Sequence, residues 1–255
     1  MIRENKIKIA LKEGKSLIGT FVKATDPAVI EVLGLAGFDF VIIDNEHTSM
    51  NKESMVGLIR AADISGMDTV VRVGQNNAME ILQALDAGAM GVQVPQIDSK
   101  AEAQSVVDRV KYAPIGKRGY ASSQRSAGYG FMNAKEYGEL SNKNTLVVCY
   151  CETLAAINNL DDILTVDEID VIFIGPYDLS QALGVLGEPE HPRVKEAVDG
   201  IIAKVTAANK AVGIIASDAE QTQKWIDKGV QFISLNSDLG MIASLGKQYI
   251  KSLKK

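Results

Sequence analysis

The sequence predicts an α/β fold, a single parallel (β/α)8 TIM barrel that spans residues 1–255. The chain has 255 residues, 46% of them hydrophobic, and one such barrel typically has ~250 residues. Short apolar runs alternate with longer amphipathic segments, and no shift in composition marks a second domain. A doubly wound sheet is the other architecture that fits this alternation. However, no Gly-x-Gly-x-x-Gly motif follows the first predicted strand.

Eight apolar runs predict the strands, because parallel strands are buried on both faces and lack a polar alternation. They cover residues 17–22, 40–44, 69–73, 91–94, 146–151, 171–174, 212–215 and 232–235.

Segments with helical spacing of apolar residues lie between these runs. They cover residues 28–36, 52–65, 78–87, 100–110, 155–164, 193–209 and 219–228, and residues 1–16 predict an amphipathic opening helix. Four of them run into a glycine, as expected of left-handed C-caps: Gly37, Gly66, Gly88 and Gly229. Two connections are longer, 112–145 and the Gly/Pro loop 184–192, and a long loop in a compact domain is usually a lid or an interface element.

Composition excludes several classes of partner. The net charge of −5 and the lack of a basic stripe argue against nucleic acid. No apolar run reaches the ~20 residues of a membrane span, and residues 1–10 lack a signal-peptide core, so we expect a cytoplasmic protein. Cys149 and Cys151 are one residue apart on a predicted strand, where a disulfide would strain the backbone. We expect two buried structural thiols.

The stretch 171–180, VIFIGPYDLS, organises the predicted site. A buried strand is broken by Gly175-Pro176, and Asp178 follows at once. Taken alone, Asp178 reads more readily as the cap of the next helix. Other polar residues change this reading, because they also gather where strands end, at the face on which barrel enzymes carry their active sites. They are Asp44, Glu46, His47, Arg72, Gln96, Tyr150, Glu152, Asn236 and Asp238.

Glu152 and Asp178 follow neighbouring strands and offer the hard oxygen ligands that suit Mg²⁺ or Mn²⁺. The alternative is that Glu152 forms a structural ion pair with Arg72. His47 is a candidate general base, since an ordinary histidine pKa of ~6.5 suits proton transfer near neutrality. Asp86 or Asp44 is placed to orient its ring. Arg72 presents a planar fork to a carboxylate or an oxyanion, so the set suits proton removal next to a carbonyl.

Several blocks of the chain carry a resemblance to a known family. They are LAGFDFVIIDNEH (35–47), VVRV (70–73), VQVP (92–95), KYAPIGKRG (111–119), ETLAAINNLDDI (152–163), IDVIFIGPYDLS (169–180) and GEPEHP (187–192). Together they resemble the metal-dependent, class II pyruvate aldolases of the HpcH/HpaI family, among them 4-hydroxy-2-oxoheptanedioate and 2-dehydro-3-deoxyglucarate aldolases.

The resemblance implies reversible cleavage of a 4-hydroxy-2-oxo acid to pyruvate and an aldehyde on a (β/α)8 barrel. It makes Glu152 and Asp178 ligands of a divalent metal (Mg²⁺, Mn²⁺ or Co²⁺), and His47 a base assisted by Asp86. It implies that Arg72 stabilises the enolate oxygen of pyruvate. It implies a homohexamer, a trimer of dimers that exchange the last helix, with residues 118–122 lining a neighbour's site. The implied substrate-binding residues are Arg72, Tyr150, Gly175, Pro176, Tyr177 and Asp178.

The chain departs from the family pattern at several positions near this site. Tyr150 stands where the family has an amide, Tyr177 and Tyr120 replace small residues, and Asn45 and Asn236 replace glycines. These changes leave the reaction open to alternatives. One is a lyase for acyl-CoA thioesters of the citramalyl or malyl type, whose phosphates Lys117, Arg118 and Arg125 would meet. The other is a metal-binding barrel that has lost catalysis.

Overall fold

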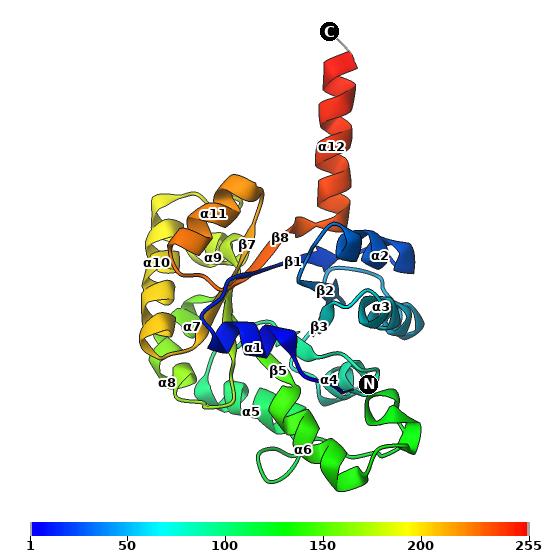
Figure 1. The fold of residues 1–255 in the computed structure, drawn as a ribbon. Coiled ribbons are helices and arrows are strands. Elements are labelled where there is room, and N and C mark those ends of the chain that lie inside the picture. Colours follow the sequence, from blue (N-terminus) through cyan, green and yellow to red (C-terminus); the bar gives the residue numbers. More distant parts are fainter. Residues whose placement is uncertain (1, 254–255) are drawn as a thin grey trace.

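The computed structural model describes residues 2–253 and contains a closed, all-parallel barrel with the strands in chain order (Figure 1). The strands are β1 (Leu17–Val22), β2 (Phe40–Asp44), β3 (Asp68–Arg72), β4 (Gly91–Val94), β5 (Leu146–Cys151), β6 (Val171–Ile174), β7 (Ala211–Ala216) and β8 (Phe232–Ser237). The barrel prediction is confirmed. Five strands have the predicted bounds, while β3 begins and ends one residue earlier and β7 and β8 are longer than predicted.

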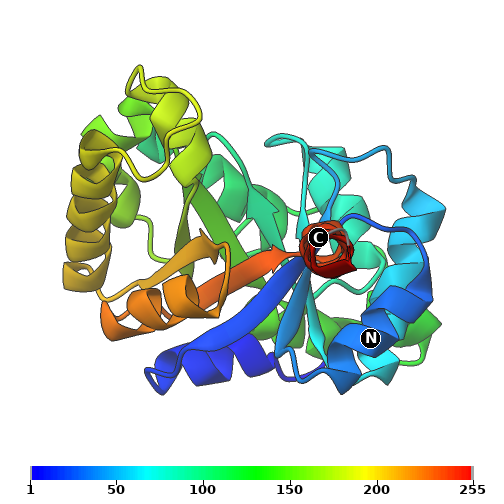
Figure 2. The same ribbon diagram turned by 90° about the horizontal axis from the view of Figure 1, so that it is seen from above.

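Most of the helices lie outside the barrel (Figures 1 and 2). They are α1 (Lys6–Lys12), α2 (Pro27–Leu35), α3 (Lys52–Ile64), α4 (Ala78–Asp86), α5 (Lys100–Val110), the 3₁₀ helix η1 (Arg125–Gly130), α6 (Ala134–Asn144), α7 (Leu154–Asn158), α8 (Leu160–Leu164), α9 (Pro176–Ala182), α10 (Pro192–Ala207), α11 (Ala219–Asp227) and α12 (Asp238–Leu253). The four predicted C-cap glycines all have positive φ, between 76° and 104°.

Three helical predictions were incomplete. The helix predicted over 155–164 is two short helices, because the chain leaves helical geometry at Asn159, whose side chain donates to the carbonyl of Asp98. The connection 112–145 contains η1 and α6, which its glycines and serines obscured. The opening helix is shorter than 1–16, because Asn5 caps it and Gly14 turns the chain with φ +74°.

The barrel interior is filled by aromatic side chains that separate its two ends. The rings of Phe40 and Phe232 stack with centroids 4.2 Å apart, and Phe173 meets Phe232 edge-on. Facing glycines make room for them, since a Cβ on Gly19 would lie 2.3 Å from the ring of Phe40 and one on Gly213 would lie 2.6 Å from Phe173. This layer forms the floor of a pocket at the carboxyl end of the strands.

The amino end of the barrel is closed by α1 and the residues before it (Figure 1). Buried Asp68 accepts the backbone N–H groups of Lys6 and Ile7 and an N–H of Arg3. Lys8 pairs with Asp170 at 2.7 Å. The N-terminal segment is therefore fixed to the strand starts by charge and hydrogen bonds.

The last helix, α12, does not pack along the barrel wall. It begins beside β1 and β8 and then projects away from the rest of the chain, as Figures 1 and 2 both show. Several of its apolar side chains are exposed, among them Ile242 (65%), Tyr249 (59%) and Leu253 (79%). None of the helices described within residues 2–253 combines the length and apolar content needed to cross a membrane.

Candidate active site

A pocket of about 310 Å³ opens at the carboxyl end of the barrel. Phe21, Phe173 and Ile215 form its apolar floor. Of the predicted site residues, His47, Arg72, Tyr150, Gly175, Pro176, Tyr177 and Asp178 line it. A wider groove of about 870 Å³ lies between α10 and α11 and shares Pro176, Tyr177, Ile215 and Asn236 with the pocket. The smaller pocket is the one at which the charged strand ends meet.

The carboxylates of Glu152 and Asp178 converge above Gly175. An ideal Cβ on Gly175 would lie 2.8 Å from Oε2 of Glu152 and 3.3 Å from Oδ2 of Asp178, so the two oxygens are at most about 6 Å apart. Two oxygens bound at ~2.1 Å to one cation lie within ~4 Å of each other. Any side chain at position 175 would occupy the space between them.

Glu152 is buried, and its charge is poorly compensated by the protein. Burial raises the pKa of the Glu152 carboxyl to about 8. The hydrogen bond from the N–H of Gln96 lowers this pKa in part, and the negative charge of Asp178 raises it further. Gln96 reaches Oε1 of Glu152 at 2.9 Å from a backbone with φ +54°, a conformation that costs a non-glycine residue roughly 1 kcal/mol. A cation between the two carboxylates would remove the repulsion, so the residues present fit a divalent metal.

Arg72 at the end of β3 is held by two carboxylates of the β2 strand and its following loop. Its Nε and Nη2 donate to both oxygens of Asp44 at 2.9 and 2.7 Å, and Nη1 lies 3.1 Å from Glu46. Burial alone would raise the pKa of Asp44, but the hydrogen bond and charge of Arg72 outweigh it and hold that pKa below its usual value. Among the described residues, Arg72 forms its ion pairs with Asp44 and Glu46. The alternative pair between Arg72 and Glu152 is therefore wrong.

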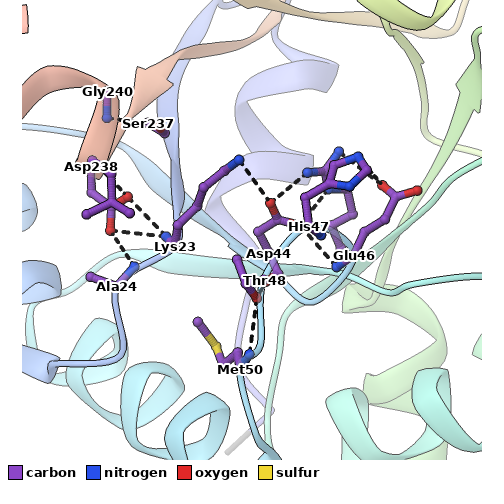
Figure 3. Close-up of polar contacts among 12 residues, drawn as sticks. Lys23, Ala24, Asp44, Glu46, His47, Thr48, Met50, Ser237, Asp238 and Gly240 are labelled. Atoms are coloured by element: carbon purple, nitrogen blue, oxygen red, sulfur yellow. Dashed lines mark hydrogen bonds and ion pairs between the residues drawn. The ribbon is translucent and has the colours of Figure 1, made fainter. Parts of the chain in front are cut away.

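His47 stands at the mouth of the pocket, on a turn built by Asp44. One oxygen of Asp44 accepts the backbone N–H groups of Glu46 and His47, and the hydroxyl of Thr48 donates to the carbonyl of Asp44. The ring Nε2 of His47 lies 3.7 Å from a carboxylate oxygen of Glu46, and Figure 3 shows the two side chains facing each other. Asp44 thus sets the position of the loop by binding its backbone rather than the histidine ring.

Asp86 is not brought to His47 within one chain. It is the last residue of α4, five residues before β4 begins, so it lies at the amino end of the barrel. Its carboxylate accepts a hydrogen bond from Arg118 at 2.6 Å, and the guanidinium of Arg118 also lies over the ring of Tyr112. Arg118 is thus held beside Asp86 within its own chain, and the placement of residues 118–122 in a neighbour's site stays a prediction.

The tyrosines near the site divide into two groups. Tyr150 is buried on the pocket floor, and its hydroxyl lies 3.4 Å from Nη1 of Arg72. Burial raises the pKa of Tyr150, so its phenol stays protonated and can donate. Tyr177 is more than half exposed on the rim. Tyr120 does not line the pocket, because it packs against Tyr112 beside the amino end and donates to the carbonyl of Ala134.

The basic residues that would serve a thioester's phosphates lie away from the pocket. Lys117 pairs with Asp108, Arg118 with Asp86 and Arg125 with Asp63. All three belong to the connection that follows α5 and covers the amino end. Cys149 and Cys151 are free and buried, facing the helices, as expected of structural thiols.

Sequence reasoning missed one cation of the site. Lys23 directly follows β1, lines the pocket, and has its Nζ 3.6 Å from Asp44 (Figure 3). The signal was present, since a lysine after the apolar run 17–22 is the same pattern that singled out Arg72 and Glu152. Asp238 was noted at the end of β8, and the structure shows that it binds backbone N–H groups beside Lys23.

A closed barrel with clustered carboxylates, an arginine and a histidine at its carboxyl end defines an enzyme that acts on a small polar carbonyl compound. Comparison with known sequences narrows this class. The sequence profile of the HpcH/HpaI aldolase/citrate lyase family matches residues 17–244. The chain belongs to this family and is an enzyme of its aldolase and lyase class.

Individual relatives agree over nearly the whole chain. It is 31% identical over 244 residues to 2-dehydro-3,6-dideoxy-6-sulfogluconate aldolase of Pseudomonas putida, covering 96% of this chain and 95% of that one. It is 34% identical to the hydroxypyruvate/pyruvate aldolase of Agrobacterium fabrum, covering 94% and 90%. The crystal structure of an HpcH/HpaI aldolase from Desulfitobacterium hafniense superposes with a TM-score of 0.94 at 26% identity, covering 99% and 98%.

Proposed function

We propose that this aldolase reversibly cleaves a 4-hydroxy-2-oxo acid to pyruvate and an aldehyde, with Glu152 and Asp178 holding a divalent cation, Mg²⁺, Mn²⁺ or Co²⁺. The observation that carries the proposal is the convergence of these two carboxylates above Gly175, beside a guanidinium. The relatives named as pyruvate and sulfogluconate aldolases support the same class of substrate. Bound there, the cation supplies positive charge that polarises the substrate carbonyl.

The chain's own residues supply orientation and proton transfer. Asp44 holds Arg72 in one orientation, and its guanidinium, which also meets Glu46 and Tyr150, stands beside the oxygen that gains negative charge when the carbon–carbon bond breaks. The neutral hydroxyl of Tyr150 donates into the same space. Past Gly175-Pro176, the first backbone N–H groups of α9, at Tyr177 and Asp178, face the substrate carboxylate. His47 takes the proton of the 4-hydroxyl group, directly or through one water.

We further propose a homo-oligomer in which α12 packs on a second copy, in a hexamer built as a trimer of dimers. The projecting helix and its exposed apolar side chains support this arrangement, because such a surface is costly in water. Asp86, which lies far from the site of its own chain, would then assist the His47 of a neighbour. Changing Ile242 to Glu should shift the mass measured by light scattering toward the monomer, whereas an unchanged mass would contradict it.

The proposed reaction is tested with a set of 4-hydroxy-2-oxo acids, assayed with Mg²⁺, Mn²⁺ and Co²⁺ in turn. Pyruvate should form from one or more of them, and a chelator should stop its formation. Turnover that survives complete chelation would contradict the role of the metal.

A second measurement separates the alternatives. Exchange of the pyruvate methyl protons with deuterium in D₂O, followed by NMR, should occur with enzyme and Mn²⁺. No exchange and no turnover would favour a barrel without catalysis. Turnover of citramalyl-type thioesters alone would favour the acyl-CoA lyase, although Lys117, Arg118 and Arg125 are paired at the other end of the barrel.

A further inference from the structure

Gln93 is a polar side chain inside the barrel that has no role in the contacts described so far. It is the third residue of β4, and its side chain is fully buried. Its neighbours Val92 and Val94 belong to the cluster that the strands form with the surrounding helices. Since successive side chains of a strand point to opposite faces, Gln93 points into the barrel.

The strand register places Gln93 next to the charged end of β3. Its Cα pairs with that of Arg72 on β3 and with that of Val148 on β5. Tyr150 follows Val148 by two residues and therefore points to the same interior face. The hydroxyl of Tyr150 lies 3.4 Å from Nη1 of Arg72. Gln93 is thus on the strand between those that carry the two members of this contact.

Neither polar atom of the Gln93 amide has a partner. In the part of the chain that the structure describes, Nε2 and Oε1 are both buried and form no hydrogen bond. Asn5 at the amino end is almost as buried, yet its amide is paired on both sides. Its Nδ2 donates to the carbonyls of Met90 and Asn144, both at 2.8 Å, and its Oδ1 accepts the N–H of Lys8 at 3.0 Å. Because an unpaired buried amide is unfavourable for stability, it is expected where a partner forms during function.

The hydroxyl of Tyr150 has the capacity for such a partner. A phenol oxygen can accept two hydrogen bonds and donate one. Among the described residues, the hydroxyl of Tyr150 accepts from Arg72, which leaves one lone pair and its own hydrogen. In the proposed reaction this hydrogen is donated to the substrate. The remaining lone pair can therefore take a donor from the barrel interior.

We propose that Gln93 is a positioning residue of the aldolase reaction: its Nε2 donates to the oxygen of Tyr150, directly or through one ordered water, and so directs the phenol hydrogen toward the substrate oxygen. This inference rests on the proposed function and adds to it a residue that acts from behind the pocket surface. A hydrogen bond accepted by a hydroxyl strengthens the one that it donates. The amide therefore acts on the developing negative charge through Tyr150.

The test is a double-mutant cycle of Gln93→Met and Tyr150→Phe, measured by exchange of the pyruvate methyl protons with deuterium in the presence of Mn²⁺. Gln93→Met keeps the size of the side chain but removes the amide. It should lower kcat roughly tenfold with little change in KM, because a hydrogen bond that acts in the transition state is lost. In the Tyr150→Phe background the same change should alter kcat by less than about twofold, since the hydroxyl through which it acts is gone.

Thr69→Val is the matched control. The hydroxyl of Thr69 is also buried and unpartnered among the described residues, but Thr69 adjoins the interior residue Val70 and therefore faces the helices. This change should leave kcat unchanged, and urea unfolding should find Gln93→Met at least as stable as the wild type. A wild-type kcat in Gln93→Met, equal losses in both backgrounds, or a loss of kcat together with stability would overturn the inference.

A crystal structure of the wild type with Mn²⁺ and pyruvate tests the contact without any variant. Nε2 of Gln93 should lie within about 3.2 Å of the Tyr150 oxygen or share one water with it. An amide that remains unpaired, or that binds another group, would overturn the inference. Deuterium exchange by the wild type separates the two levels of the account. Normal exchange with an unaffected Gln93→Met variant refutes only the role of Gln93, whereas no exchange by the wild type refutes the proposed function and this inference with it.

Discussion

The two ends of the barrel bury carboxylates in opposite ways. At the amino end, Asp68 is fully buried and accepts two backbone N–H groups and an N–H of Arg3. At the carboxyl end, Glu152 is nearly as buried but accepts only the N–H of Gln96. Asp178 accepts no hydrogen bond from the described residues. Burial raises the pKa of both Asp68 and Glu152; at Asp68 the cation Arg3 opposes the rise, whereas at Glu152 the carboxylate Asp178 adds to it.

This difference separates stability from function. A buried charge whose lone pairs are filled by the protein fixes the fold and has nothing left to bind. A buried charge with unfilled lone pairs, placed beside a second like charge, destabilises the protein when no ligand is bound. Such a charge is typical of a site where a bound ligand supplies the missing partner. The amino end therefore holds the N-terminal segment on the barrel, and we expect the reacting groups at the carboxyl end.

The largest effect is expected at Glu152, where the change Glu152→Gln should lower kcat/KM by about 10³-fold or more by removing a metal ligand. The same change removes a buried charge next to Asp178. Without metal, the variant should therefore be at least as stable as the wild type, with a free energy of unfolding higher by up to about 1–2 kcal/mol. Steady-state assays and urea unfolding measure the two effects. A variant that keeps its activity but loses stability would show that Glu152 serves stability rather than function.

The matching change at the other end is Asp68→Ala. It leaves the N–H groups of Lys6 and Ile7 without an acceptor and Arg3 without one of its partners, so it should cost about 3 kcal/mol of unfolding free energy. Activity per folded molecule should remain that of the wild type. A large loss of kcat in folded Asp68→Ala would show that the two ends are not separate.

Next in size is Arg72→Lys, which keeps the charge but loses the two-pronged contact with Asp44. We expect kcat to fall about 10²-fold, with a smaller change in KM, because without this contact the cation is no longer held in a fixed position beside the oxygen that becomes charged during the reaction. A rise in KM alone would show that Arg72 binds the substrate without stabilising the transition state.

The smallest of the four effects is expected for Gly175→Ala. The added methyl group would lie 2.8 Å from Oε2 of Glu152 and must push the two carboxylates apart, which should weaken Mn²⁺ binding roughly tenfold. Gly138→Ala in α6 is the matched control, because a Cβ there meets nothing within 4 Å. Equal Mn²⁺ affinity in both variants would contradict the claim that the metal site needs a glycine at position 175.

The strands and most helices followed from the sequence because apolar runs, N-caps and C-cap glycines are local signals. The convergence of strand ends followed from barrel geometry, which brings residues as distant as Arg72 and Asp178 to one pocket. Contacts made by long polar side chains did not follow. Arg118 reaches back to Asp86, and Asp238 binds the backbone of Lys23, because tertiary packing selects such partners from many in reach. The break at Asn159 was missed for the same reason.

The central claim is that Glu152 and Asp178 hold a single divalent cation. Titration of the protein with Mn²⁺, followed by electron paramagnetic resonance of the free ion, tests it most directly. We predict one tight site per chain, bound at least tenfold more weakly by both Glu152→Gln and Asp178→Asn, and a change in the bound Mn²⁺ signal when pyruvate is added. Wild-type protein without such a site, or variants that bind Mn²⁺ as tightly as the wild type, would contradict the claim.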